Sequence, residues 1–488
     1  MRLTVVLLLS LLAWGQAGPP GYFFPSNRIA GVGVERDDLS AAVLESRTDL
    51  MIQSQTFGIM RDQDALAGAK RITDSKLQAI FRAAAESSGF PKLQLEAIAY
   101  LESWGDPNAE SPTGPKGIMQ ISEATAHDMG LKVVRAMKYK ITREQVAVKR
   151  KGRKPKFKTV THKEPYIVTV RDDRLTPSLA IPAAARYLAN IERKFGGRDW
   201  AIFAYHCGAG CVTSMIDLTS HARGIPSDEI TVPRMFFSCS PSWNRELYLA
   251  IQQQMLRDYS PTYYFRIQRA AQLLDLYRQD ADAFAAMQRG YKNQFASGPR
   301  APHRLSAWLT RDDLIYRTQA DIRANLGSRL MSAPDKSDYL GYTLRLSPPD
   351  TATVQFSQAA PAALGALTYV AFETHRLYLD RNQVDEPFQP LAVTALVEPE
   401  DGARQSGQRE AAAHSSGQVF DIDTSHMPAP ELECLRFVLN DLGWSGYLGF
   451  VEDGADRLHI GCAPGSRDFF SGVWQEAQEH VSANEMGR

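Results

Sequence analysis

The sequence predicts an α+β protein in which a mainly helical part carries a β-hairpin insertion and is followed by a smaller α/β part. Apolar residues recur at helical spacing from Ser75 onward. Between residues 132 and 170 the pattern changes to alternation around a glycine and a proline, which is typical of two paired strands. Helical patterns resume at Ser178 and continue to about Asn325. Residues 347–361 are the expected linker to the α/β part.

Length and composition restrict the class of protein. The 488 residues are 44% hydrophobic and 23% charged, which suffices for two or three globular domains and excludes a wholly disordered chain. Lys+Arg and Asp+Glu both number 55, so no overall basic field favours nucleic acid as a partner. Residues 132–165 are the exception, because they hold thirteen lysines and arginines and only two glutamates.

The first residues have the pattern of an export signal. Arg2 precedes an apolar run over residues 3–14, which is too short to span a bilayer, and Gly15 and Ala17 are small residues at a cleavage position. A buried N-terminal helix is the alternative. We therefore expect a signal peptide at 1–17, an N-terminal segment at 18–74, no transmembrane segment, and export to the periplasm or the extracellular space.

Five cysteines in an exported chain permit disulfides. Cys434 and Cys462 form the natural pair near the C-terminus. Cys239 would bond either Cys207 or Cys211, and one thiol would remain free.

The first helices place a glutamate at a helix end. A helix is expected to stop at Gly89, and the next runs from about Pro91, a residue tolerated in a first turn, to Trp104. Glu102 lies in its last turn. The apolar surface of this helix and its C-terminal dipole both disfavour a carboxylate, so we expect a raised pKa that suits a general acid.

Three ordered motifs carry a family resemblance. Residues 102–121 resemble the Glu-Ser…Gly-Leu-Met-Gln core of SLT-type lytic transglycosylases. Residues 173–188, beginning Asp-Arg-Leu-Thr-Pro, are similar to a later helix of that family, and residues 204–210 resemble its Ala-Tyr-Asn-x-Gly motif. The resemblance covers about residues 75–260 and implies a lysozyme-like fold there, with a helical connector and linker over 261–362.

The resemblance also implies a reaction on peptidoglycan. Glu102 would protonate the oxygen between N-acetylmuramic acid and N-acetylglucosamine, and then accept the proton of the muramoyl 6-hydroxyl as a 1,6-anhydro ring closes. Because the nucleophile belongs to the substrate, neither a second carboxylate nor a cofactor is required. Ser103, Met119, Gln120 and Tyr205 are expected to bind the glycan, with capping or packing as the alternative. His206, which stands where the family usually has Asn, is expected to bind it as well.

The expected partners are the glycan strands and stem peptides of the cell wall. The basic insertion would meet anionic carboxylates or phosphates there, and a solvated hairpin is the alternative. Two other functions remain open: a lysozyme-like hydrolase that uses the same Glu102 with water, and a non-catalytic scaffold that binds the wall.

A second candidate site lies near the C-terminus. His414 and Asp421 are seven residues apart, and the later His459 completes a set of one carboxylate and two imidazoles that suits catalytic zinc. The pattern, preceded by an apolar segment at 391–397, resembles zinc peptidases of the D-alanyl-D-alanine carboxypeptidase type. The resemblance implies a domain over 363–488 with Asp456 as general base and Glu452 as its competitor. A degenerate wall-binding module is the alternative.

Overall fold

A computed structural model describes residues 23–26, 29, 40–150, 153–254, 260–291, 305–310, 312–334, 338–346, 356–382, 389–405 and 411–486. The expected signal peptide at 1–17 lies outside these residues. The chain divides into two compact units, one of residues 64–195 and 270–279 and the other of residues 1–63, 196–269 and 280–488. Helices predominate, and both units also contain strands, which confirms the α+β class.

The unit of residues 64–195 and 270–279 is helical apart from its hairpin. Asp74 accepts a hydrogen bond from the Lys76 amide at 3.0 Å and begins one helix, which ends at Gly89 with φ +77° as expected. The following helix buries nearly its whole middle, residues 95–100. The elements are α4 Ala65–Ile72, α5 Ser75–Ser88, α6 Lys92–Ser103, α7 Glu123–Asp128, β1 Val133–Arg150, β2 Arg153–Asp172, α8 Pro177–Phe195 and the end of α13 Tyr263–Gln279.

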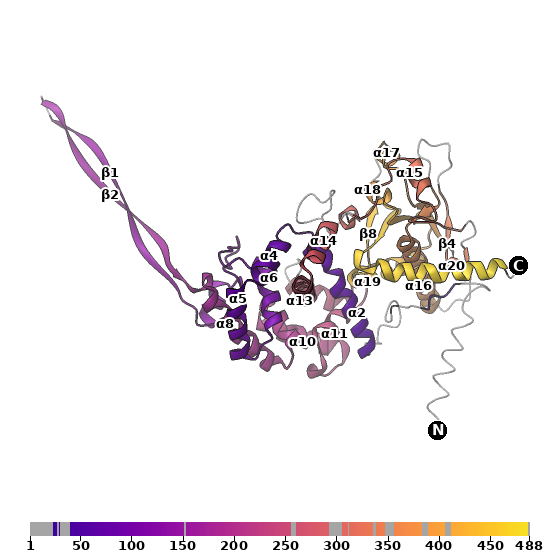
Figure 1. Ribbon diagram of the computed structural model, residues 1–488, viewed down its shortest axis with the longest axis horizontal. Helices are drawn as coiled ribbons and strands as arrows, with labels where there is room; N and C mark the ends of the chain where they lie inside the picture. The colour runs from indigo at the N-terminus through magenta and orange to yellow at the C-terminus, as the bar shows by residue number, and fades with distance from the viewer. Residues whose placement is uncertain are drawn as a thin grey trace, which may run out of the picture. The chain divides into compact units, whose positions relative to one another are not determined.

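The basic insertion forms the expected hairpin. Among the described strands, β1 and β2 pair only with each other, in antiparallel register, and form a long two-stranded ribbon (Figure 1). The chain enters and leaves the ribbon at one place, since the Lys132 amide donates to the Asp173 carboxylate at 2.9 Å and the Asp173 amide donates to the Lys132 carbonyl at 3.0 Å.

The other unit begins with helices that continue the expected helical part. A disulfide joins Cys207 and Cys211 across the glycine between two of them, so the expected bond to Cys239 is wrong; Cys239 is a buried free thiol. The helices are α2 Ala41–Ser54, α3 Thr56–Met60, α9 Arg198–Cys207, α10 Ala209–Arg223, α11 Val232–Phe237, α12 Arg245–Gln254, the start of α13, α14 Ala281–Tyr291 and α15 Gln319–Ala324.

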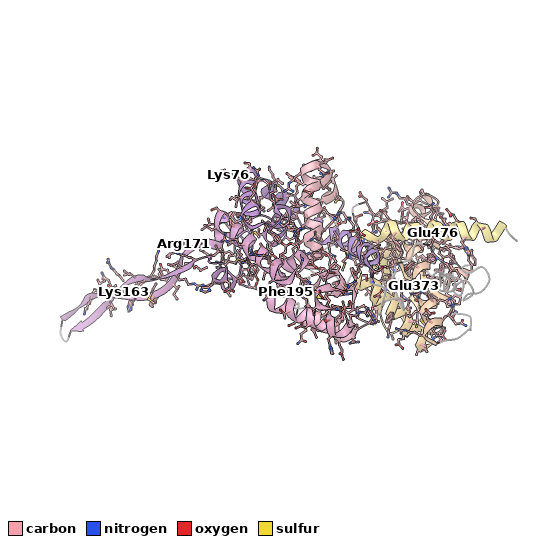
Figure 2. All side chains as sticks on the ribbon, turned by 90° about the horizontal axis from the view of Figure 1, so that it is seen from below. Lys76, Lys163, Arg171, Phe195, Glu373 and Glu476 are labelled. Atoms are coloured by element: carbon pink, nitrogen blue, oxygen red, sulfur yellow. A yellow bond between two sulfur atoms is a disulfide. The ribbon has the colours of Figure 1, made fainter. Side chains whose placement is uncertain are left out.

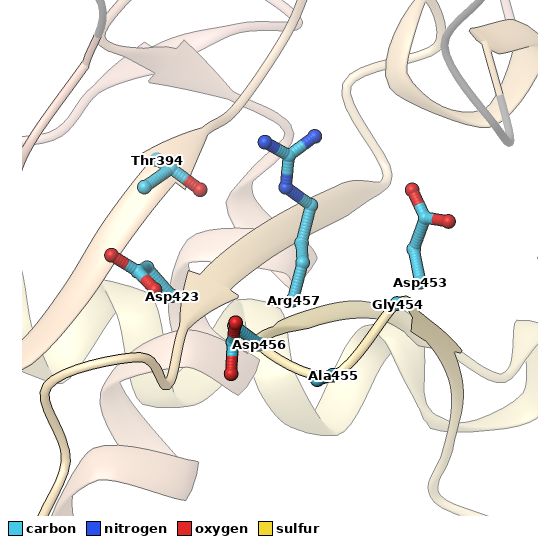
Figure 3. Close-up of a pocket in the computed structure, with 7 residues that line it drawn as sticks. All are labelled: Thr394, Asp423, Asp453, Gly454, Ala455, Asp456 and Arg457. Atoms are coloured by element: carbon cyan, nitrogen blue, oxygen red, sulfur yellow. The ribbon is translucent and has the colours of Figure 1, made fainter.

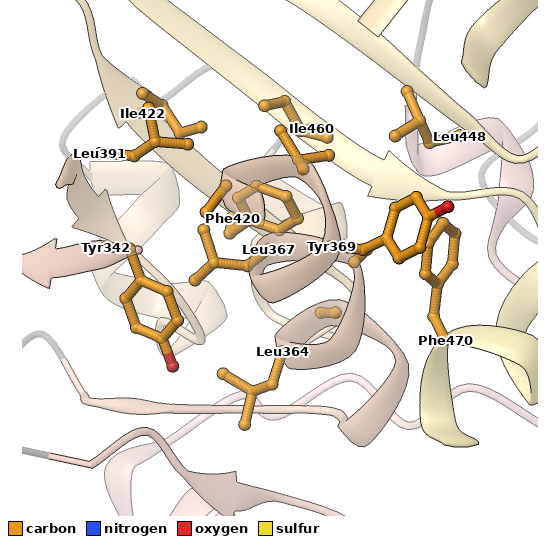
Figure 4. Packing of buried hydrophobic residues seen from close by; sticks show 14 of the residues in the cluster. Tyr342, Leu364, Leu367, Tyr369, Leu391, Phe420, Ile422, Leu448, Ile460 and Phe470 are labelled. Atoms are coloured by element: carbon orange, nitrogen blue, oxygen red, sulfur yellow. The ribbon is translucent and has the colours of Figure 1, made fainter. Parts of the chain in front are cut away.

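A five-stranded sheet with the order β4-β6-β7-β9-β8 organises the α/β part of the same unit. One face of the sheet packs on α16, α19 and α20, where Phe420 and Ile460 meet Leu367 (Figure 4). The elements are β3 Met331–Ser332, β4 Tyr342–Leu344, β5 Gln358–Ala359, α16 Pro361–Asn382, β6 Leu391–Ala395, α17 Glu400–Gln405, α18 Ala411–His414, β7 Val419–Asp423, α19 Ala429–Trp444, β8 Leu448–Asp453, β9 Arg457–Cys462 and α20 Arg467–Met486.

The sheet begins earlier in the chain than residue 363, where we expected this domain to start. Strand β4 pairs in parallel with β6, and Ala359 of β5 is fully buried in the core. Part of the expected linker is therefore an ordered piece of the α/β part; its residues 347–355 lie outside the described residues.

Cys434 and Cys462 do not form the expected disulfide, and both thiols are buried and free. The Cys462 thiol donates to the carbonyl of Ala362, at the start of α16, whereas Cys434 lies beside Arg381, at the end of the same helix. Nineteen residues of helix separate the two places by about 28 Å, so the sulfurs cannot meet.

Among the described helices, none alone is long and apolar enough to cross a membrane. The bent pair α9 and α10 meets that criterion by length and composition only.

Candidate functional sites

Glu102 lies half-buried in the last turn of α6, as expected. The helix ends because Trp104 adopts a left-handed conformation with φ +52°, and Gly105 continues the turn with φ +71°. The Arg71 guanidinium donates to the Trp104 carbonyl at 3.1 Å, and the Trp104 ring packs edge-on against Tyr100 at 4.7 Å. These contacts hold the helix end, and therefore the backbone that carries Glu102, in one position.

The loop after α6 is tied back to that helix by Ser103. Its buried hydroxyl contacts the carbonyl of Ala99 at 3.0 Å and that of Ile118 at 2.8 Å, so this residue fastens the loop to α6. Met119 is fully buried and exposes no surface to a sugar, in contrast to the expectation that it lines the groove. The methionine packs inward because the loop folds onto the helix, and this burial corrects the role that the motif implied.

Gln120 is half-buried, and its side chain shapes the same loop. Its backbone has φ +45°, a conformation that non-glycine residues rarely adopt. The side-chain amide donates to the carbonyl of Gly117 at 2.9 Å and to that of Ala109 at 3.1 Å. The donors that were expected to face the glycan are thus used inside the loop in this state.

Arg174 joins this loop to the base of the hairpin. Its buried guanidinium forms a bidentate pair with Asp172 at 2.7 and 2.8 Å, and it donates to the carbonyls of Gly114 and Ile121 at 3.3 Å. The hydrogen-bonded Arg174 lowers the pKa of Asp172 even though burial opposes that shift. Arg174, which belongs to the motif at 173–188, therefore holds the loop of the motif at 102–121 in place. The sequence did not predict this role.

Replacing Gly117 by alanine should disrupt this loop. Gly117 has φ +79°, and an added Cβ would lie 1.9 Å from the carbonyl oxygen of Arg174. We expect a loss of about 1–3 kcal/mol in unfolding free energy, measured by urea denaturation. Gly114→Ala is the matched control, because Gly114 also has a positive φ of +109° but has open space around it. Equal losses in the two variants would rule out the clash with Arg174.

Tyr205 and His206 lie at the end of α9, in the other unit. Tyr205 is half-buried and His206 is exposed, with its ring stacked on Tyr263 at a centroid distance of 4.7 Å. His206 stands where the family usually has Asn, and the stacked ring of Tyr263 holds its imidazole in place. Their roles toward the glycan remain predictions.

The three expected metal ligands meet on the sheet face opposite the α/β core. His414 ends α18, and Asp421 of β7 pairs directly with His459 of β9. The Asp421 Oδ1 atom lies 2.9 Å from His414 Nε2 and 2.6 Å from His459 Nδ1, and the two imidazole nitrogens are 3.3 Å apart. Ligand atoms that bind a tetrahedral zinc ion at about 2.0 Å lie about 3.3 Å from one another. The two distances from Asp421 Oδ1 to the imidazole nitrogens would therefore have to lengthen slightly to admit the ion.

The surroundings of the three residues also fit a cation. All three are buried, and Asp421 Oδ2 and His459 Nε2 have no hydrogen-bond partner among the described residues. His414 Nδ1 lies 3.1 Å from the Leu396 carbonyl, an arrangement that would leave Nε2 free to bind metal. Burial opposes charge on both groups, yet Asp421 raises the pKa of His414 to about 9, and His414 lowers the pKa of Asp421 to about 2.

The candidate general base sits differently from the expectation. Glu452 pairs with Leu458, so its side chain faces the α16 and α19 side of the sheet, away from His459; it contacts Arg436 instead. Its role as the competing base is therefore wrong, because alternate residues of a strand point to opposite faces. Asp453 lies on the metal-ligand face, with its carboxylate 3.5 Å from His459 Nε2.

A pocket of about 490 Å³ lies at the β8–β9 turn and is lined in part by Asp453, the neighbour of His459 (Figure 3). Asp456, the expected base, lines this pocket at the β8–β9 turn and is exposed. Asp423 and Arg457 line the pocket as well. Asp423 lies two residues after Asp421 on β7 and Arg457 two residues before His459 on β9, so both are on the sheet face that carries the ligands. Asp453 was missed because strand register is not visible in a single sequence.

Comparison with known proteins identifies the class of the first domain. Residues 79–145 and 156–225 match the family model described as "Transglycosylase SLT domain". The chain therefore carries a transglycosylase SLT domain, and the match includes Glu102, Gln120, Arg174 and Tyr205.

Individual relatives agree with this class. The chain is 33% identical over 137 residues to "Peptidoglycan transglycosylase gp16" of Escherichia phage T7, which is 28% of this chain and 8% of the relative. It is 30% identical over 156 residues to "Membrane-bound lytic murein transglycosylase F" of Alcanivorax borkumensis, 30% of this chain and 25% of that protein. The chain thus spans a quarter or less of the length of these relatives.

Proposed function

We propose that this protein is an exported, wall-associated lytic transglycosylase of peptidoglycan. Glu102 first donates a proton to the oxygen between N-acetylmuramic acid and N-acetylglucosamine. It then accepts the proton of the muramoyl 6-hydroxyl, which attacks the anomeric carbon and forms a 1,6-anhydro ring. The glycosidic bond breaks, and both proton transfers pass through one carboxyl group.

The observation that carries the proposal is the SLT match together with the position of Glu102. The matched segments include the acid, the loop that follows it and the Arg174 clamp that holds the loop. The relatives' names support peptidoglycan, or murein, as the substrate. A substrate-borne nucleophile requires no second carboxylate at the spacing that hydrolases use.

Mass spectrometry of sacculi digested by the whole protein tests the proposal. A transglycosylase releases muropeptides with anhydro ends, each one water lighter than the corresponding hydrolysis product. Products with reducing ends would establish a lysozyme-like hydrolase. Binding to sacculi with no soluble product would establish a wall-binding scaffold.

A second activity, that of a zinc-dependent murein peptidase, is supported by the convergence of three buried ligands. His414 Nε2, Asp421 Oδ1 and His459 Nδ1 would hold the ion, and Asp453 would orient His459 through its second nitrogen. A bound zinc ion would supply Lewis-acid activation of water and of a peptide carbonyl. Asp456 and Arg457 line the adjacent pocket, where a stem peptide would be positioned.

One zinc ion per chain is the expected result of metal analysis after loading and dialysis. Zinc at a hundredfold excess over its Kd should raise the unfolding free energy by about 2.7 kcal/mol. His414→Ala with Asp421→Ala should abolish both the metal and the stabilisation, whereas His426→Ala, at an exposed histidine outside the cluster, should change neither. A wild-type protein that binds no zinc would reject the site, independently of any peptidase assay.

A further inference from the structure

The β1–β2 hairpin carries an uncovered apolar surface. In the register of β1 and β2, Met137 faces Ile167 and Tyr139 faces Pro165, and opposed residues share one side of a two-stranded ribbon. Met137 is 62% exposed and Ile167 is 68% exposed. One side of the ribbon, called here the apolar face, thus presents Met137, Tyr139, Ile141, Pro165 and Ile167, and Lys163, the cross-strand partner of Ile141, lies at its end.

The opposite side of the ribbon is mixed, because lysines and glutamates stand there among Val146, Val160 and Tyr166. Its cross-strand neighbours, called here the charged face, are Lys138 with Tyr166, Lys140 with Glu164, Thr142 with His162, Glu144 with Val160, and Val146 with Lys158. Figure 2 shows side chains standing out from the ribbon between Arg171 and Lys163. Within the described part of the hairpin, Lys138 and Lys140 of the charged face and Lys163 at the end of the apolar face form no salt bridge, so the excess of positive charge is not neutralised there.

Such a surface is unusual on a protein that acts only in water. A two-stranded hairpin is at best marginally stable by itself, and contiguous exposed apolar surface marks an interaction site. The first strand has 18 residues and the second has 20, which is far longer than a turn between two helices requires.

We propose that the apolar face of the hairpin lies on a lipid bilayer with anionic headgroups. The apolar residues would enter the boundary between headgroups and acyl chains, and the lysines and arginines would contact lipid phosphates. Tyrosines beside such residues suit that boundary, because their rings are apolar and their hydroxyls remain hydrated.

Charge and amphipathic character favour this partner over the others. A second copy of the hairpin would bring two strongly basic segments together, because residues 132–165 hold thirteen lysines and arginines against two glutamates. A soluble polyanion would satisfy the charges but would leave Met137, Ile141 and Ile167 in water. A bilayer with anionic headgroups satisfies both features.

Co-sedimentation of the full-length protein with vesicles tests the proposal. Vesicles of phosphatidylglycerol and phosphatidylcholine should bind the protein, and pure phosphatidylcholine vesicles should bind it at least about tenfold more weakly. The variant Met137→Ser, Ile141→Ser, Ile167→Ser should lose at least about tenfold in affinity for anionic vesicles. Its matched control, Val146→Ser, Val160→Ser, Tyr166→Ser, alters the charged face and should stay within about threefold of the wild type.

Circular dichroism and glycan cleavage, measured on the same variants, establish that the proteins are folded. Equal loss in both triple variants would overturn the proposal, because binding would not depend on the apolar face. So would full binding by the apolar-face variant, equal binding to neutral vesicles, or no vesicle binding at all. Dimerisation that the apolar-face variant abolishes, without vesicle binding by the wild type, would assign the face to a second copy instead.

Discussion

Replacing Glu102 by glutamine is expected to lower glycan cleavage by about a hundredfold to ten-thousandfold. The amide has nearly the same shape but can neither donate the acidic proton nor accept the proton of the 6-hydroxyl. The release of soluble muropeptides from sacculi measures the loss, and co-sedimentation with sacculi measures retained binding.

A control close in sequence is Glu110→Gln. Glu110 is exposed and forms a surface pair with Lys116 at 2.9 Å, so its loss should change turnover by no more than about twofold. If Glu102→Gln retained wild-type turnover, or if Glu110→Gln lost as much, another group would have to be the proton donor.

Replacing Glu96 by alanine should cause the largest loss of stability, about 3–5 kcal/mol in unfolding free energy. Glu96 is fully buried on α6, where its carboxylate accepts a hydrogen bond from Gln78 at 2.7 Å and forms an ion pair with Arg278 of α13. Removal of the carboxylate leaves the partly buried Arg278 guanidinium without Glu96, leaves the Gln78 amide without its acceptor, and also breaks the ion pair with Lys92 at 3.6 Å. Urea denaturation followed by circular dichroism measures the change.

Two further variants separate the ion pair from general damage. Asp275 is an exposed partner of the same Arg278 at 3.0 Å, so Asp275→Ala should cost less than about 1 kcal/mol. Replacing both Glu96 and Arg278 by methionine should recover most of the loss, because the apolar side chains fill the space and the partly buried guanidinium is no longer left without Glu96. If Glu96→Ala were no more harmful than Asp275→Ala, the pair would have no special role in stability.

Local patterns predicted much of this fold, because they depend on neighbours in the chain. Gly89 ends α5 by its own backbone freedom, and the alternation over residues 132–170 is a property of the two strands themselves. The ligands His414, Asp421 and His459 were found because their spacing carried a family resemblance, and the sheet register then brought them together.

Contacts between distant segments could not be predicted in the same way. The partner of Glu96 lies 182 residues away, and nothing near either residue indicates the pairing. Strand register decides which side of the sheet Glu452 and Asp453 face. A shift of one residue would turn Glu452 toward the metal ligands and Asp453 toward the core. Cys434 and Cys462 seemed paired in sequence, but they lie near opposite ends of α16.

The hairpin begins and ends at residues that face each other, Val133 and Asp172. Because Lys132 and Asp173 are hydrogen-bonded to each other at the base of the hairpin, the helices before and after it are connected much as they would be by a tight turn. The outer part of the ribbon can therefore be shortened or lengthened with little effect on the helices, as long as Arg135 and Asp172 at its base keep their pairs with Glu123 and Arg174. The length and the surface of the hairpin can thus vary independently of the helix that carries Glu102.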